Sequence, residues 1–455
     1  MRQFLNVIAF AISALFIVIA CKKDPVVNDS IPDPACLLDM LSWNYASVPL
    51  GFAESNLNNN KADGFNRAKI SWYNIDPGIF YDKSTYLRPP NLSKDDMSAD
   101  DCRIIYENEL FPSKVNQYNK PIYLNVFNVD YYPEERGPWN YDTQASAYSA
   151  GIGNDGKLNE PSTRWAGITR KLEITGFKTN YLDFWLIDPF TTYPDAKGEL
   201  YFDIGDISED VLKDGFLSAE NTVEGVAKSS VWGLVKPLLN SNSFPSKNSP
   251  TFDTGLDELV DTDETAHFSS YLDEINSICS PTIFASVYKD PANDDYHSYL
   301  GDDYNQLNYK VRDRYKNYNN GEQNSYPATY GNGVIYQYSP NTEDINGNGI
   351  LDTLNNYFEY KIRIDKGLFV SGTNSIVEMF DSGINNSFHL ENGSLAKTKF
   401  YHFRIPLTEF SGTYGSPNLA SNPKFIRLYF KGFSTPVNLR FINLMFSEDI
   451  IVYTH

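Results

Sequence analysis

The segment from Asp344 to Asp352 has residue types and a spacing that suit calcium. Its candidate ligands are Asp344, Asn346, Asn348, the backbone carbonyl of Ile350, and Asp352. Gly349 provides the sharp turn of an EF-hand-like loop, whereas the twelfth position is Asn355 instead of the usual bidentate glutamate. The pattern predicts a calcium site that Glu343, Glu359 or water would complete. The alternative is an Asx-rich turn that precedes a strand.

Several tryptophans could form stacking surfaces for sugars. The predicted binding residues are Trp139, Trp165 and Trp185, with Trp232 as a further candidate. Large aromatic side chains also contribute strongly to core burial, so core packing is the alternative role for each of them.

No catalytic signature stands out in the sequence. The five histidines are scattered, and neither a His-Glu-x-x-His helix nor a Gly-x-Ser-x-Gly elbow occurs. The acidic pairs Asp294-Asp295 and Asp302-Asp303 could serve as acid and base only if they converge in space, which the sequence does not fix. Solvated loops or additional calcium ligands are simpler readings. We therefore expect a protein that is not an enzyme, with no catalytic residues.

The N-terminus resembles a bacterial lipoprotein signal. A weakly basic start precedes an apolar run from Phe10 to Ala20, and a cysteine follows at once. We predict a signal peptide over 1–20, acylation of Cys21 and a flexible lipidated tether over 21–38. The N-terminal lipid would hold the protein on a membrane without a spanning helix.

Charge and cysteine content narrow the possible partners further. The formal net charge of −20 excludes nucleic acid as a partner, because phosphates would repel the chain. Cys36, Cys102 and Cys279 lack the close pair spacing of metal sites, and at most one disulfide can join two of these three.

The composition predicts a mainly β protein, with aromatic residues at 15% of the chain. Alternation of apolar and polar residues, typical of half-buried strands, occurs over 358–365, 401–405, 426–431 and 439–441. The polar, solvent-facing positions of the last three segments would be His402, Arg404, Arg427 and Arg440. The order of these segments resembles the closing strands of galactose-binding-like jelly rolls. We therefore predict an antiparallel jelly-roll sandwich with a loop-rich, partly helical insertion.

Earlier segments would supply the first half of this sandwich. The apolar runs 181–187 and 200–204, separated by a turn, are expected to be neighbouring antiparallel strands, and 208–210 to cap a helical turn. The predicted division is 39–213 for the first half, 214–357 for the insertion and 358–455 for the closing strands.

The insertion contains one clear helical pattern. Phe268, Tyr271, Leu272 and Ile275 follow helical spacing. Asp261 with Glu264 would cap the start of this helix.

Many ordered segments resemble one protein family. The first group is Ala68–Pro77, Tyr132–Asp142, Arg164–Arg170, Leu182–Phe190 and Gly198–Asp214. The second group is Gly255–Leu259, Asp290–Tyr296, Arg314–Asn320, Asn341–Asn346 and Phe430–Phe446. In this order they resemble the soluble region of SprA, the outer-membrane translocon of type IX secretion and gliding motility. The resemblance covers about 41–446.

The resemblance implies a place in protein export. We expect a non-enzymatic outer-membrane lipoprotein that is accessory to type IX secretion or gliding machinery. Its partners would be an outer-membrane barrel, another translocon component or exported cargo, met through sheet edges or loops. The alternative is a surface lipoprotein that binds glycans as carbohydrate-binding modules do. The cell surface and the periplasmic face both stay open as locations.

Overall fold

The computed structural model describes residues 36–81, 88–112, 122–173, 179–220, 228–235, 254–318, 328–330, 333–335, 341–383, 388–419 and 422–448. The predicted signal peptide, Cys21 and most of the predicted tether lie outside these residues. Leu37 and Leu38, the last residues of that tether, are buried, and the Leu37 amide donates to the Leu444 carbonyl at 2.9 Å. The folded part therefore begins earlier than predicted.

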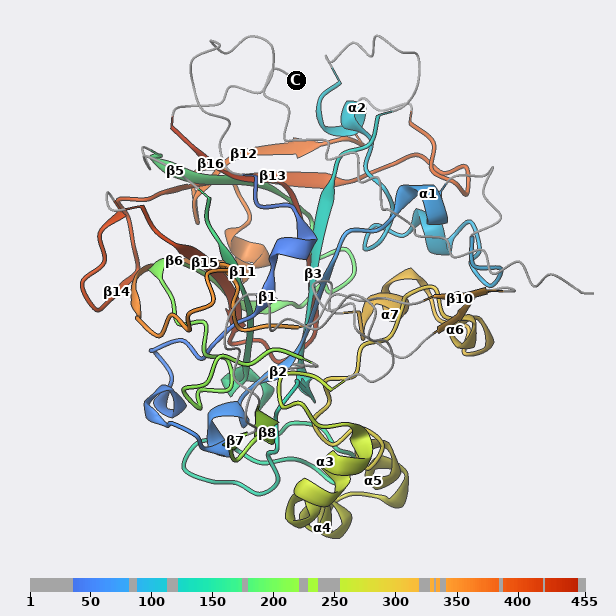
Figure 1. Cartoon of the computed structure of the whole chain (residues 1–455). Coiled ribbons are helices and arrows are strands. Elements are labelled where there is room, and N and C mark those ends of the chain that lie inside the picture. Colours follow the sequence, from blue (N-terminus) through green and yellow to red (C-terminus); the bar gives the residue numbers. More distant parts are fainter. Residues whose placement is uncertain are drawn as a thin grey trace, which may run out of the picture.

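Two six-stranded antiparallel sheets form the body of the protein (Figure 1). The first sheet has the order β1 (Asn44–Tyr45), β4 (Trp165–Lys171), β15 (Phe425–Lys431), β6 (Lys197–Asp206), β11 (Asn356–Asp365) and β14 (Gly412–Tyr414). The second has the order β12 (Ile376–Asp381), β13 (Lys399–Pro406), β5 (Tyr181–Ile187), β16 (Val437–Ser447), β3 (Val126–Arg136) and β2 (Ala68–Tyr73). The mainly β prediction is confirmed.

The two sheets face each other across an aromatic core. Phe184 of β5 lies 5.7 Å from Phe202 of β6, and Tyr131 of β3 stacks on Phe430 of β15 at 5.2 Å, both measured between ring centroids. All four side chains are buried in the main hydrophobic cluster. Apolar residues at every second strand position supply this inner layer, as the alternation predicted.

The prediction that β5 and β6 are neighbours in one sheet is wrong. β5 pairs with β13 and β16, whereas β6 pairs with β11 and β15 in the opposite sheet. The chain therefore crosses between the layers at the turn after β5. A turn of this kind does not reveal whether the next strand returns to the same sheet.

Short helices complete the described structure. They are α1 (Pro77–Phe80), α2 (Glu107–Leu110), α3 (Asp261–His267), α4 (Ser269–Ile278), α5 (Pro281–Val287), α6 (Asp302–Gln306) and α7 (Val311–Tyr315). Single turns of 3₁₀ helix occur at Met40–Ser42, Ala53–Asn56, Lys61–Gly64, Asp96–Ser98, Pro161–Thr163 and Lys366–Leu368. Two small hairpins pair β7 (Lys228–Ser229) with β8 (Leu234–Val235) and β9 (Ala328–Tyr330) with β10 (Gly333–Ile335).

Helices α3 to α7 all follow β6 and precede β11 in the sequence. In space, α3 to α5 gather at one end of the molecule (Figure 1). The predicted helix is confirmed as α4, where Tyr271, Leu272 and Ile275 are buried. The predicted cap is wrong, because Val260 is the N-cap residue of α3 and Asp261 and Glu264 lie in its first turn. The 208–210 segment likewise forms no helical turn.

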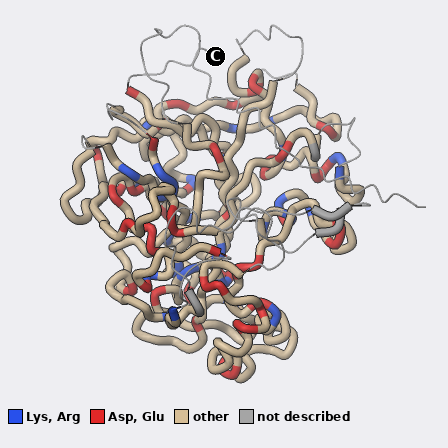
Figure 2. Tube along the Cα trace, viewed as in Figure 1, with Lys and Arg blue, Asp and Glu red and all other residues tan. Residues whose placement is uncertain are grey.

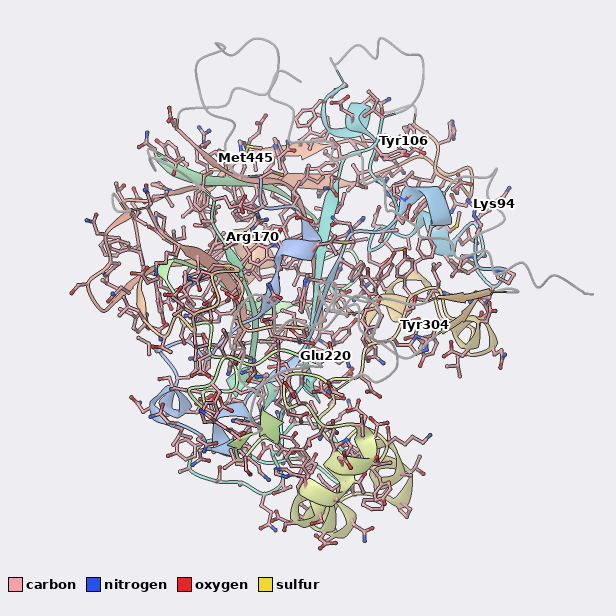
Figure 3. All side chains as sticks on the ribbon, viewed as in Figure 1. Lys94, Tyr106, Arg170, Glu220, Tyr304 and Met445 are labelled. Atoms are coloured by element: carbon pink, nitrogen blue, oxygen red, sulfur yellow. The ribbon has the colours of Figure 1, made fainter. Side chains whose placement is uncertain are left out.

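Buried glutamates fix both ends of the long segment between β6 and β11. Glu220, labelled in Figure 3 between the sheets and helices α3 to α5, accepts the amides of Thr254 and Asn341 at 3.3 and 3.0 Å. Glu343 accepts three backbone amides between residues 211 and 218. Carboxylates that accept several amides replace the water those groups would otherwise need.

The outer faces of the central strands are covered, so the prediction that the polar side chains of 401–405, 426–431 and 439–441 face solvent is wrong for four of them. His402, Arg404, Arg427 and Arg440 are all buried. The Arg440 guanidinium donates to the backbone carbonyls of Asp100 and Arg103, in a segment that lies over the second sheet. Arg427 similarly donates to the Ser47 carbonyl at 3.2 Å, in a segment over the first sheet.

Each covered face carries a buried ion pair. Arg427 of β15 meets Asp203 of β6, and both side chains are fully buried. On the other sheet, Asp183 of β5 accepts from His402 and from Arg404, the latter at 2.7 Å. These strands therefore join through buried charges as well as through their backbones.

We predict that Arg427→Met destabilises the protein by about 3–5 kcal/mol, because Asp203 is left as an uncompensated buried charge. The double variant Arg427→Met/Asp203→Leu should recover much of this loss. Urea unfolding gives both free energies. Lys361→Met is the control, since its pair with Glu199 is partly exposed on the same sheet and should cost less than about 1 kcal/mol. Equal losses in Arg427→Met and Lys361→Met would contradict the prediction.

Candidate functional site

The predicted calcium loop folds as a series of tight turns. The two carboxylate oxygens of Asp344 accept the amides of Asn348 and Gly349, each at 2.9 Å. Asn348 in turn accepts the amide of Ile350 at 2.7 Å. Gly347 and Gly349 adopt left-handed backbone angles, with φ of 71° and 75°. Because glycine tolerates positive φ, the loop reverses here without strain.

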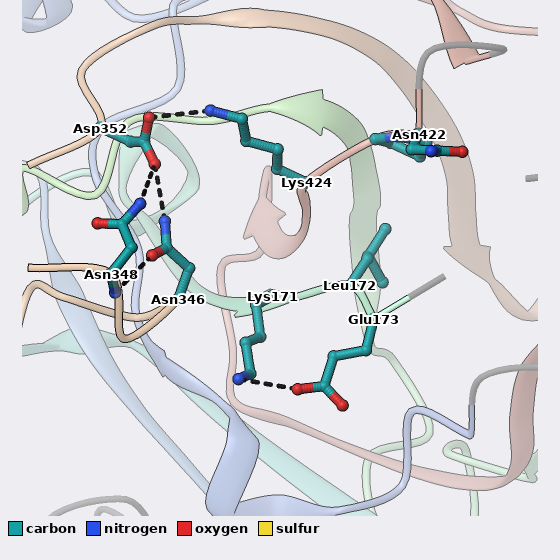
Figure 4. A pocket seen from close by; sticks show the side chains of 9 residues that line it. Lys171, Leu172, Glu173, Asn346, Asn348, Asp352, Asn422 and Lys424 are labelled. Carbon is teal, nitrogen blue, oxygen red and sulfur yellow. Dashed lines mark hydrogen bonds and ion pairs between the residues drawn. The ribbon is translucent and has the colours of Figure 1, made fainter. Parts of the chain in front are cut away.

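Asp352 closes the loop onto its own start. One of its oxygens accepts from the side-chain amide of Asn346 at 2.7 Å, and the other pairs with Lys424 at 3.0 Å (Figure 4). The predicted side chains are therefore brought together. Asn346 directs its amide nitrogen toward Asp352. The Lys424 ammonium pairs with the other Asp352 oxygen, for which a bound calcium ion would have to compete. This arrangement matches the Asx-rich alternative, while calcium binding stays a prediction.

The two glutamates expected to complete the site have other partners. Glu343 holds the 211–218 segment, and Glu359 accepts from the Tyr429 hydroxyl at 2.7 Å. The carboxylate beneath the loop is instead Glu209, which the sequence did not single out. Its two oxygens accept the amides of Asn346 and Asp352 at 3.0 and 3.1 Å.

Glu209 is buried within a cluster of like charges. Its pKa is raised to about 7, mainly by burial; the two donated amides oppose this shift, and the nearby carboxylates of Asp352 and Asp344 add to it. The residue lies more than a hundred positions before the loop, so no local pattern in the sequence connects them. Only the pairing of β6 with β11 brings the two segments together.

An open pocket of about 390 Å³ lies beside this loop (Figure 4). Its walls are Lys171, Leu172, Glu173, Asn346, Asn348, Asp352, Asn422, Pro423 and Lys424. Lys171 pairs with Glu173 at 2.8 Å, and Lys424 pairs with Asp352. The charged walls are thus neutralised in pairs, which suits polar contacts with a partner better than capture of a charged small molecule.

The prediction of tryptophan stacking surfaces is wrong for the four residues considered. Trp139, Trp165, Trp185 and Trp232 are each at most 1% exposed. Trp185 stacks on His402 at 4.7 Å inside the protein. A ring without exposed surface cannot stack on a sugar, so these side chains serve packing.

The cysteines divide into two kinds. Cys102 and Cys279 are free thiols, and Cys36 is disulfide-bonded. The partner of Cys36 is therefore not among the other described cysteines. Cys21, the predicted lipid attachment site, lies outside the described residues.

A second group of carboxylates was not predicted as a site. Asp257, Glu264 and Asp294 each place one oxygen within 4.8 Å of the others. Of the three, the sequence indicated a possible ligand role only for Asp294, which with Asp295 could be an acid–base pair, part of a solvated loop or an additional calcium ligand, whereas Glu264 was expected to cap a helix. Asp257 and Glu264 lie about thirty positions or more before Asp294, so only the folded chain reveals the group.

Acidic positions occur throughout the trace, with lysines and arginines interspersed among them (Figure 2). The described residues include no helix with the length and apolar content required to cross a membrane.

We predict that Glu209→Gln loosens the 344–352 loop, because the amide NH₂ cannot accept one of the two backbone hydrogen bonds. A loss of about 1–3 kcal/mol should speed exchange of the Asn346 and Asp352 amides roughly tenfold to a hundredfold. Hydrogen exchange read by mass spectrometry measures this. Glu173→Gln, an exposed change in the same pocket, is the control. Unchanged exchange in Glu209→Gln would show that Glu209 does not hold the loop.

Comparison with known proteins adds one match. Residues 270–449 match the SprA_N family, described as a motility related/secretion protein. No curated protein matches the chain. The matched range begins within α4, contains the 344–352 loop and ends after β16. The resemblance predicted from the sequence is confirmed over this range, and residues 270–449 are a SprA-like region of the chain.

Proposed function

We propose that this protein is a non-enzymatic lipoprotein of the outer membrane that assists type IX secretion or gliding machinery through protein contacts. The observation that carries the proposal is the match of 270–449 to a motility and secretion family. Association with secretion or motility follows from that family, whereas the lipid anchor and the accessory role are our extension.

The strand pairing supports a SprA-like region larger than the matched one. Within the match, β13 pairs with β5, β15 lies between β4 and β6, and β16 lies between β5 and β3. The strands β3 to β6 all precede residue 270. The matched region cannot complete either sheet alone, so we extend the resemblance to the whole sandwich.

The order of the strands supports assigning the body as a jelly roll. Numbering β3, β4, β5, β6, β11, β13, β15 and β16 from one to eight, the central sheet orders become 1-8-3-6 and 2-7-4-5. This interleaving of early with late strands is what two Greek keys folded across two sheets produce. On this assignment, β1, β2, β12 and β14 are additions at the sheet edges.

A sheet edge offers a means of contact with a partner. β12 pairs with β13 alone among the described strands. Val377 and Met379 on β12 are 48% and 42% exposed, and Val370 nearby is 46% exposed. Exposed apolar edge strands readily pair with another chain, and proteins usually guard them with charge. We therefore assign β12 as the docking edge for a translocon component.

Affinity purification from membranes in gentle detergent tests this function. We expect the wild-type protein to recover an outer-membrane component of the secretion or motility machinery. Val377→Lys/Met379→Lys should reduce this recovery strongly without lowering the melting temperature, because charge on an edge strand blocks pairing. Leu307→Lys is the matched control, because Leu307 is an exposed apolar residue that does not belong to β12. Failure of the wild-type protein to recover any such component would contradict the proposed function.

Mass spectrometry tests the anchor. The N-terminal peptide of the mature protein should begin at Cys21 and carry acyl chains, and Cys21→Ser should move the protein out of the membrane fraction. A thioether lipid and a disulfide at the Cys21 sulfur exclude each other. Acylation of Cys21 therefore requires that Cys36 pair with a cysteine of another molecule or be reduced in the mature protein. A non-reduced peptide that joins Cys21 to Cys36 would refute acylation. Protease treatment of intact cells would then distinguish the surface from the periplasmic face.

A further inference from the structure

Three acidic side chains lie together in the interior, away from the pocket and the 344–352 loop. Asp257, Glu264 and Asp294 are at most 4% exposed. Asp257 precedes α3, Glu264 lies on α3, and Asp294 follows α5. One oxygen from each lies within 4.8 Å of the other two. This separation is about twice a Ca²⁺–oxygen distance of roughly 2.4 Å, so one ion could contact all three.

Neighbouring groups fix the orientation of these carboxylates. Glu264 accepts the amide of Ala292 at 2.8 Å, and Asp294 accepts from the indole nitrogen of Trp139 at 2.8 Å. The Trp139 amide in turn donates to the Ala292 carbonyl at 2.7 Å. The cluster is therefore held by a fixed frame and does not depend on flexible side chains.

Two polar atoms at the cluster have no hydrogen-bond partner among the described residues. One oxygen of Asp257 accepts the Leu259 amide, whereas the other is buried and unpartnered. The hydroxyl of Tyr141, a residue only 3% exposed, is also buried and unpartnered. Burial raises the pKa of the Tyr141 hydroxyl, and the charges of Asp257, Glu264 and Asp294 raise it further. Buried polar atoms without partners are rare, and an unseen ion is one common explanation.

The group has too little positive charge of its own. The strongest charge effects on each of the three carboxyls come from other acids, Asp290 among them. The Arg136 guanidinium donates to the Tyr271 hydroxyl and to the backbone carbonyls of Asp290 and Pro291. These hydrogen bonds do not go to the three carboxyls. Burial, and after it the charges of neighbouring acids, raise the pKa of Asp294 and of Glu264 above their usual range. Without a cation, the cluster must hold protons to remain buried.

We propose that Asp257, Glu264 and Asp294 bind a divalent cation of the calcium type. The ligands are all hard oxygen atoms, with no histidine or cysteine among them, which disfavours zinc and softer metals. The ion would fasten α3 and the 290–295 segment to Trp139 in the loop after β3. This inference is independent of the proposed function, because it concerns how the helical segment is held on the sandwich.

Terbium luminescence and thermal unfolding test the proposal on the full chain purified in detergent and treated with a chelator. Excitation of tryptophan should produce terbium emission, since Trp139 contacts a ligand, and added calcium should quench this emission by competition. Calcium should also raise the melting temperature.

Asp257→Asn/Glu264→Gln should weaken calcium binding roughly tenfold or more, since fewer charged ligands remain. The metal-free variant should still fold, because the amides resemble protonated acids in shape. Asp257→Asn alone is the milder version if the double variant folds poorly. Asp263→Asn, exposed on the same helix, should bind as the wild type does.

Asp344→Asn/Asp352→Asn separates this site from the 344–352 loop. Calcium effects that persist in this variant and disappear in the Asp257 variants would support the buried site. The proposal is overturned if the wild-type protein shows neither terbium emission nor calcium stabilisation. It is equally overturned if the Asp257 variants keep the wild-type response.

Discussion

The fold depends on one constraint, which is that the central strands of both sheets are buried on both faces. The inner faces meet in an aromatic core, whereas the outer faces lie under long connecting segments. Charged side chains on the outer faces must therefore find partners within the protein, as Arg427 does with Asp203 and Arg404 with Asp183. Buried pairs of this kind tolerate little change of geometry, because each charge loses its hydration and depends on the other. They help to fix which strands are neighbours and in which register.

The sequence predicted where the strands lie in the chain much better than which segments cover them or which strands are their neighbours. Alternation in 358–365 and 401–405 identified real strands and their inner faces, since side chains alternate along a strand whatever covers it. It did not reveal that Arg404 faces a covered surface. That outcome depends on segments distant in the chain, such as 100–111. The placement of β5 and β6 in opposite sheets was missed for a related reason, because the turn between them is compatible with either arrangement.

The candidate sites differ in the same way: a site within one short stretch of sequence was predicted, whereas sites formed by residues far apart in the sequence were not. The 344–352 loop was predicted because all its residues lie within one short stretch. Glu209 and the group formed by Asp257, Glu264 and Asp294 come from separate segments, so their meeting is a product of the tertiary structure. The tryptophans failed as predicted binding residues because residue type alone does not distinguish a ring in the core from one on the surface. In each case burial decided the role.

The interleaving of early and late strands has a consequence for how the chain matures. β16 inserts between β5 and β3, and β15 inserts between β4 and β6. Because the chain is synthesised from its N-terminus, both sheets therefore lack an inner strand until β15 and β16 have been made. During that interval, open strand edges and bare aromatic surface face the surroundings. Any chaperone that escorts the nascent polypeptide must shield these surfaces until residues 425–447 have been synthesised.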